Sequence, residues 1–131
     1  MTPEKDAALV KDFPSLYQDR NKPMNQTCMC WGFECGDGWE PLIRELSQKL
    51  EALILALPEA ERANYRAMQV KEKFGTLRFY MTLSTDEMFA LINEAEAKSA
   101  TTCEQCGENG KRRGGSWVST QCDACHEKPR R

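Results

Sequence analysis

The segment Ala67–Leu83 reads AMQVKEKFGTLRFYMTL and decides the fold, because apolar and polar side chains alternate on both sides of a Phe-Gly pair. Alternation with a period of two places the apolar side chains on one face of a β-strand. A glycine-containing break between two such runs marks a hairpin loop. The segment therefore predicts a β-hairpin whose buried face carries two facing pairs: Val70 with Phe79, and Met68 with Met81.

The opposite face of this hairpin carries positive charge. Lys71 lies opposite Arg78 in the predicted register, and like charges directly across a strand pair are unfavourable. Such a face calls for an acidic partner, which is either a carboxylate of the chain, such as Glu40 or Glu51, or a macromolecule that binds there. The candidate binding residues on this face are Lys71, Lys73, Arg78 and Tyr80.

Helices precede and follow the hairpin. Apolar side chains recur at helical spacing over residues 42–57 and predict an amphipathic helix that stops at Pro58. The preceding segment, Gly36–Pro41, offers Asp37 as a helix cap and a proline near the first turn. The run Ser84–Glu87 is a capping-box pattern, and it predicts a second helix that leads directly into the cysteine-rich end.

The N-terminal third has a weaker pattern. Thr2-Pro3 followed by acidic and then apolar residues predicts a short helix that ends before Pro14. Residues 18–38 show no regular period and contain turn-forming residues and three cysteines, which indicates a long ordered loop or an irregular layer.

The C-terminal segment contains two Cys-x-x-Cys pairs separated by fifteen residues. This spacing places four thiolates around one tetrahedral zinc ion. Such a site is closed, because protein ligands fill all four positions and none is left for water or substrate. The sequence therefore predicts a structural zinc site whose ligands are Cys103, Cys106, Cys122 and Cys125.

Other uses of the cysteines can be weighed against this one. Residues 122–126 also spell a c-type haem attachment, but the upstream Cys-x-x-Cys pair already accounts for both thiols, and no export signal is visible. Cys28, Cys30 and Cys35 either supply a second metal site, with His126 or a carboxylate completing it, or pack as small apolar side chains. Packing is the favoured interpretation, and His126 is expected to be exposed beside the zinc site.

Charge is unevenly distributed along the chain. The formal net charge is −2, which argues against a general nucleic-acid binder. The segment from Cys103 onward nevertheless carries six basic and four acidic residues, and the basic ones include Lys128, Arg130 and Arg131. Lys111, Arg112 and Arg113, followed by two glycines, predict a basic flexible tip between the two cysteine pairs that could contact phosphate.

Composition and motifs narrow the class of protein. At 131 residues, with 40% hydrophobic and 29% charged residues, the chain has the size of one globular domain. It has neither an apolar run long enough to span a membrane nor a secretory signal, so we expect a cytoplasmic protein with reduced cysteines. No phosphate-binding glycine loop, nucleophile elbow or metal-hydrolase helix is present, so the chain is expected not to be an enzyme and shows no small-molecule substrate site.

Three motifs together carry a resemblance. The segment Cys35–Trp39 (CGDGW), the segment Val70–Tyr80 (VKEKFGTLRFY) and the two Cys-x-x-Cys pairs with Trp117 between them resemble a group of small uncharacterised proteins of bacteria, phages and prophages. The resemblance spans residues 13–125. It implies a cytoplasmic accessory protein that is encoded by a phage, and it implies no catalytic residue.

The sequence thus predicts an α+β protein with two main helices packed on a β-hairpin. Residues 1–100 form the body, and residues 101–131 form a zinc ribbon packed on it as one unit. The predicted function is a non-enzymatic zinc-binding adaptor or inhibitor that binds another macromolecule, foremost a host protein. The alternative is a nucleic-acid-binding regulator that uses the basic hairpin face and the ribbon tip.

Overall fold

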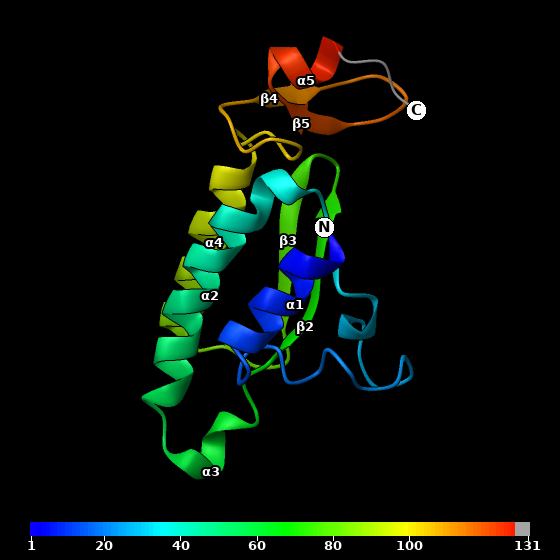
Figure 1. Cartoon of the computed structure of the whole chain (residues 1–131). Helices are drawn as coiled ribbons and strands as arrows, with labels where there is room; N and C mark the ends of the chain where they lie inside the picture. Colours follow the sequence, from blue (N-terminus) through cyan, green and yellow to red (C-terminus); the bar gives the residue numbers. More distant parts are fainter. Residues whose placement is uncertain (128–131) are drawn as a thin grey trace.

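The computed structural model describes residues 1–127 and has the predicted α+β class. Helices lie on one face of a three-stranded sheet, and a small two-stranded ribbon sits beyond the end of the sheet (Figure 1). The elements of the body are α1 (Pro3–Asp12), η1 (Met29–Trp31), β1 (Phe33–Glu34), η2 (Asp37–Trp39), α2 (Glu40–Leu55), α3 (Glu59–Arg62), β2 (Ala67–Lys73), β3 (Thr76–Met81) and α4 (Asp86–Ser99). The ribbon comprises β4 (Lys111–Arg113), β5 (Ser119–Gln121) and α5 (Asp123–Glu127).

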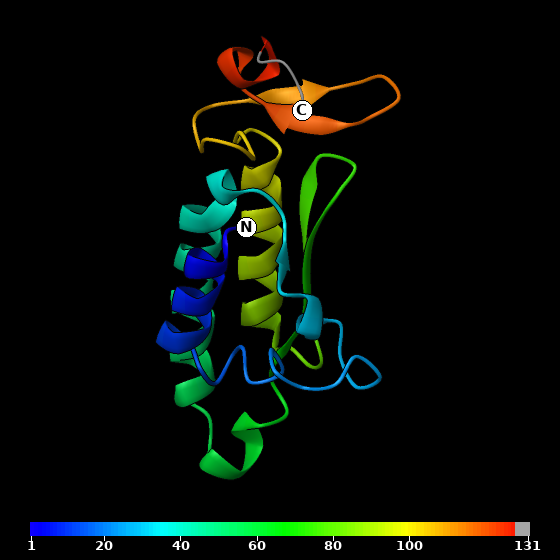
Figure 2. The ribbon, with the colours of Figure 1, turned by 45° about the vertical axis from the view of Figure 1, so that its right-hand side comes forward.

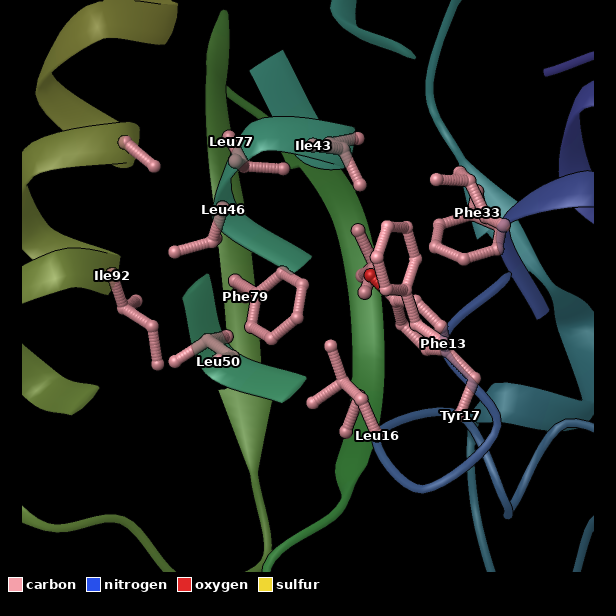
Figure 3. Close-up of a cluster of buried hydrophobic side chains, with 14 of the residues drawn as sticks. Phe13, Leu16, Tyr17, Phe33, Ile43, Leu46, Leu50, Leu77, Phe79 and Ile92 are labelled. Atoms are coloured by element: carbon pink, nitrogen blue, oxygen red, sulfur yellow. The ribbon is translucent and has the colours of Figure 1, made fainter. Parts of the chain in front are cut away.

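The amphipathic helix α2 supplies the centre of the core. Its buried residues Ile43, Leu46, Leu50 and Ile54 recur every three or four positions, so they form one stripe. This stripe faces side chains of β3, α4 and the segment that follows α1 (Figure 3). Burial also raises the pKa of Tyr17, whose hydroxyl shares a hydrogen bond with Ser47 of α2.

The caps of the two main helices differ from each other. The N-cap of α4 is Thr85, one residue later than the capping-box pattern Ser84–Glu87 predicts, and its hydroxyl accepts a hydrogen bond from the backbone N–H of Met88 at 3.2 Å. The prediction that Asp37 caps the helix beginning near residue 40 is wrong, because the N-cap of α2 is Trp39 and makes no side-chain cap bond. Asp37 instead accepts a hydrogen bond from the N–H of Thr2, at the start of α1, at 2.8 Å.

The hairpin register agrees with the prediction near the loop and differs at the open end. Val70 pairs with Phe79 and Lys71 with Arg78, as predicted. Met68, however, does not pair with Met81, because an irregularity between residues 67 and 69 brings Ala67 opposite Met81. The extra residue turns Met68 out of the core, and its side chain is 40% exposed.

Neither edge of the hairpin is left open where it meets the body. The backbone N–H of Leu77 donates to the hydroxyl of Ser99 at 2.8 Å, and that of Phe79 donates to the carboxylate of Glu96 at 3.0 Å. Side chains of α4 thus satisfy the outer donors of β3, which protects an edge strand from pairing with other chains. On the other side, β1 pairs in parallel with β2 and adds a third strand that the sequence did not reveal.

The irregular segment before β1 is held in place by a half-buried ion pair. Arg20 donates to Asp6 of α1 at 3.0 Å and to the carbonyl of Cys30 at 3.1 Å. The second carboxylate oxygen of Asp6 accepts from the N–H of Phe33 at 3.2 Å. These bonds give the predicted ordered loop its shape and bring β1 alongside the hairpin.

The hairpin loop contains an unfavourable residue. Phe74 and Gly75 both have positive φ values, 53° and 86°, as in two-residue type I′ turns. Asn-Gly is the preferred pair there, because a bulky side chain is strained at positive φ. Packing does not compensate for this strain, because the Phe74 ring is 61% exposed. Folding of the hairpin therefore does not account for a phenylalanine at this position.

We expect Phe74→Asn to stabilise the protein by about 0.5–1 kcal/mol, because asparagine tolerates positive φ better than phenylalanine does. The melting temperature, followed by circular dichroism, should rise by about 2–4 °C. The matched control is Phe89→Asn, which removes a similarly exposed ring from the helical backbone of α4, where asparagine brings no gain. A lower melting temperature for Phe74→Asn would contradict this account of the loop.

Candidate metal centre and adjoining surfaces

The fold brings all four predicted cysteine ligands together. Cys103 and Cys106 lie in the turn that follows α4, while Cys122 precedes α5 and Cys125 lies within it. Their sulfur atoms are 3.6–3.9 Å apart. Tetrahedral zinc with Zn–S bonds of about 2.3 Å requires sulfur atoms about 3.8 Å apart. The geometry therefore fits one tetrahedral metal ion, and a cluster of four cysteines able to hold such an ion is present.

The pKa values of the clustered thiols also favour a bound cation. Burial opposes ionisation of Cys103, but hydrogen bonds from the backbone of Cys122, Cys106 and Gln105 outweigh it and lower its pKa to about 6. Burial and the neighbouring thiols raise the pKa of Cys125 to about 12. One thiolate is thus stabilised while a full set repels itself, so four thiolates can coexist only around a positive ion.

The first cysteine pair is anchored to the body by the segment before α2. The carbonyl of Glu104 accepts from the N–H of Gly38 at 2.7 Å, and its carboxylate accepts from the N–H of Gly36 at 2.8 Å. The indole N–H of the fully buried Trp39 donates to the carbonyl of Thr102 at 2.8 Å. The Gly-Asp-Gly-Trp segment is therefore the part of the body on which the metal-binding turn, Cys103–Cys106, packs.

The two glycines of this segment are required because its backbone lies very close to that of the metal-binding turn. A Cβ atom on Gly38 would lie 2.2 Å from the carbonyl oxygen of Cys103, and one on Gly36 would lie 2.4 Å from that of Glu104. Both distances are far below van der Waals contact, so only glycine fits. The segment Gly36–Trp39 was predicted to cap a helix, and its contact with the metal-binding turn was not predicted. The sequence does contain a signal for this contact, because two glycines flank an aspartate at a place where no predicted turn requires a glycine.

A second contact joins the ribbon to the tip of the hairpin. The hydroxyl of Thr120, which is fully buried, donates to the carbonyl of Gly75. The carbonyl of Thr120 in turn accepts from the N–H of Glu104 at 3.0 Å. The ribbon forms its own sheet rather than extending that of the body, and it rests on the hairpin tip through β5 (Figure 2).

The predicted basic face lies on the outer side of the sheet. Lys71 and Arg78 are paired across β2 and β3, Lys73 lies over the Phe74 ring at 5.7 Å, and Tyr80 is 43% exposed. Within residues 1–127, no carboxylate oxygen lies within 4.0 Å of a side-chain nitrogen of the three cations. The Nε atom of Arg78 is buried and has no hydrogen-bond partner in that part of the chain.

The local carboxylates expected to neutralise this face are engaged elsewhere. Glu40 pairs with Arg44, one turn along α2, at 2.7 Å. Glu51 is buried and accepts from the backbone N–H groups of Ser15 and Leu16 at 3.2 and 2.8 Å. The expectation that Glu40 or Glu51 neutralises the cations of the hairpin is wrong, because both carboxylates lie on the helical side of the sheet.

The basic segment of the ribbon is a strand and not a flexible tip. Lys111–Arg113 forms β4 and pairs with β5. The Arg113 guanidinium is committed to Asp123 at 2.7 Å and to the carbonyl of Gln121 at 3.2 Å, whereas Lys111 and Arg112 are exposed. The predicted basic residues Lys128, Arg130 and Arg131 lie outside the described residues.

The three earlier cysteines do not converge. Among residues 1–127, the only group of cysteine, histidine and acidic side chains arranged to hold a metal is the late cluster. Cys35 is buried, and this burial, reinforced by Glu104, raises its pKa to about 12. Cys30 donates weakly to the carbonyl of Thr27, and Cys28 is exposed. Packing therefore accounts for Cys35, and His126 is exposed outside the cluster.

No helix in the described part of the chain is both long and apolar enough to cross a membrane. Comparison with known proteins identified no matching family, no matching characterised protein and no matching solved structure.

The protein is expected to bind one zinc ion per chain, and Cys106→Ser or Cys122→Ser should remove it. Without the ion, the pairing of β4 with β5 should loosen, because the cysteine pairs that bracket these strands are no longer joined. Trypsin should then cleave within the segment Lys111–Arg113. In the zinc-loaded protein the same segment should resist cleavage. Elemental analysis and limited proteolysis test this, with Cys28→Ser as the control. Retention of a full equivalent of zinc by both variants would contradict the assignment.

Gly38→Ala should detach the ribbon without emptying the metal site. The added Cβ collides with the Cys103 carbonyl, and we expect a loss of about 1–3 kcal/mol in unfolding free energy. All four ligands lie within residues 103–125 and none comes from the segment that contains Gly38, so zinc content should stay at one per chain. The control is Gly114→Ala, where a Cβ meets no atom within 4 Å. Equal denaturant stability of the two variants would show that the close contact is unimportant.

Proposed function

We propose that the protein is a zinc-binding adaptor or inhibitor that acts by binding another protein and not by catalysis. Two features together carry this proposal: a closed four-cysteine centre, and a basic sheet face on which Lys71, Lys73 and Arg78 form no ion pair within 4.0 Å among residues 1–127, although Glu34 is the strand neighbour of Lys71. The centre offers an ion no open position for substrate, so its contribution is to hold the ribbon on the body. The basic face is then the candidate binding surface, because its cations lack ion-pair partners.

Zinc is the metal that the donor set favours. Four thiolates in tetrahedral geometry suit zinc, whereas calcium and magnesium take oxygen ligands. Such a site would be maintained in the reducing cytoplasm, where thiols stay available as ligands. The proposed cytoplasmic location and the proposed phage or prophage origin rest on the sequence arguments above, and a host protein is the partner that this origin favours.

A nucleic-acid-binding regulator is the second candidate function. It is favoured by the exposed cations Lys111 and Arg112 of β4, which add to those of the hairpin face. It is disfavoured by the acidic chain as a whole and by the ion pair that withdraws Arg113. Salt separates the two candidates, because phosphate contacts weaken steeply as the salt concentration rises.

The test is affinity capture of partners from cells of the organism that encodes the chain. Lys71→Ala should reduce recovery of the main partner protein at least about tenfold, because it removes a central cation of the face. The control is Lys49→Ala, on the exposed side of α2, where the lysine pairs with Glu45. An unchanged partner list for Lys71→Ala and for Arg112→Ala would contradict both surfaces. Loss of capture after nuclease treatment would favour the second candidate.

A further inference from the structure

Two exposed aromatic rings lie at the corner where the hairpin meets the ribbon. Phe74 is 61% exposed and Trp117 is 64% exposed. They line the same open groove, of about 350 Å³. The remaining lining residues are Glu72, Lys73, Ser116 and Val118. Large exposed aromatic side chains grouped in one concave site are typical of binding surfaces.

The two walls of this groove come from distant parts of the chain. One wall is the tip of the β2–β3 hairpin, and the other is the loop between β4 and β5, which overhangs that tip in both orientations (Figures 1 and 2). The contact of Thr120 with Gly75 sets their spacing. The ribbon wall is held in turn by the four-cysteine centre, so the groove has its observed shape only when the ribbon is folded.

The aromatic residue on the hairpin wall does not serve the fold. Phe74 occupies a strained positive-φ position at which asparagine or glycine would be preferred, and its ring gains no burial in return. Strain retained at an exposed position points to a binding role. A ligand that covers the ring would supply the burial that the isolated chain lacks.

The charge next to the groove defines the occupant. Lys73 lines the groove, and Lys71 and Arg78 continue from it along the same outer face, two residues further from the loop. None of the three forms an ion pair within 4.0 Å in residues 1–127, although Glu34 of β1 is the strand neighbour of Lys71, and the buried Nε of Arg78 lacks an acceptor there. A bound group that brings anionic acceptors to this row would satisfy all three.

We propose that the groove docks an acidic segment of a partner protein. An apolar side chain of that segment sits between Phe74 and Trp117, and carboxylates beside it pair with Lys73, Lys71 and Arg78. Protein is favoured over a single-stranded nucleic acid because Glu72 forms part of the groove wall. A peptide can place its carboxylates away from Glu72, whereas a phosphodiester chain carries a negative charge at every step.

This proposal rests on the proposed adaptor function and adds a dependence on metal. Removal of the ion frees the β4–β5 loop and thereby Trp117, so the second wall of the groove is lost. Partner binding is therefore conditional on a loaded four-cysteine centre, although no ligand of the metal touches the partner.

The experiment selects binders from a displayed library of random dodecapeptides on the full zinc-loaded chain. The most enriched peptide is synthesised, and its affinity is measured by fluorescence anisotropy. The variants are Phe74→Asn, which preserves the hairpin, and Trp117→Ser on an exposed loop. The matched control is Phe89→Asn, on the exposed side of α4. The same preparations are tested with oligo(dT) and by sedimentation equilibrium.

The expected consensus has acidic residues around an aromatic or aliphatic one. Each groove variant should reduce the affinity for the peptide at least about tenfold, whereas Phe89→Asn should leave it unchanged. Chelation of zinc should abolish binding of the peptide. Three results would overturn the proposal. They are the absence of an acidic and apolar consensus, a consensus peptide insensitive to both groove variants, and groove-dependent binding of oligo(dT) or of a second copy of the chain.

The result is separable from that of the capture experiment. If a host protein is captured through Lys71 while the two groove variants capture it equally well, the adaptor function stands and the groove is excluded as its docking site. If the peptide binds as expected but no host protein is captured, the groove stands and the adaptor function fails.

Discussion

The contact between Gly38 and the metal-binding turn is the constraint on which the rest of the structure depends. The backbone at Gly38 approaches Cys103 and Glu104 so closely that no side chain fits between them, and Trp39 is buried beneath the same turn with its indole N–H bonded to Thr102. This single junction fastens the start of α2 to the end of α4. It therefore positions the metal-binding turn on the helical layer, and together with the contact between Thr120 and Gly75 it places the ribbon over the hairpin.

The metal centre and the hydrophobic core divide the task of stabilisation. The core beneath the sheet is built from α2, α4, β3 and the segment after α1, and it uses ordinary amphipathic patterns. The ribbon, by contrast, has two short strands and little apolar surface to bury, so it needs another source of order. Four sulfur atoms at metal-binding distance supply it. This division is the reason why the proposed docking groove depends on a metal site although none of the metal ligands lines it.

Much of the fold and all four candidate ligands could be predicted, because both depend on local spacing. The register at Val70 and Phe79 follows from alternation about a two-residue loop, and the start of α4 follows to within one residue from a four-residue capping pattern. The errors lie where distant residues intervene. Asp37 bonds to the start of α1 instead of capping α2, and an irregularity at Met68 rotates a methionine out of the core. Neither event leaves a mark in the neighbouring sequence.

By itself, the amino-acid sequence determined the α+β class, the main helices, the hairpin and the cysteine ligands, since each of these is encoded by residues close together in the chain. Only the tertiary structure decided what these elements do to one another. It placed Cys103 against Gly38, kept Glu40 and Glu51 away from the cations of the hairpin, and brought Trp117 beside Phe74. The physical reason is that contacts between distant residues depend on packing and close approach, which no sequence period records.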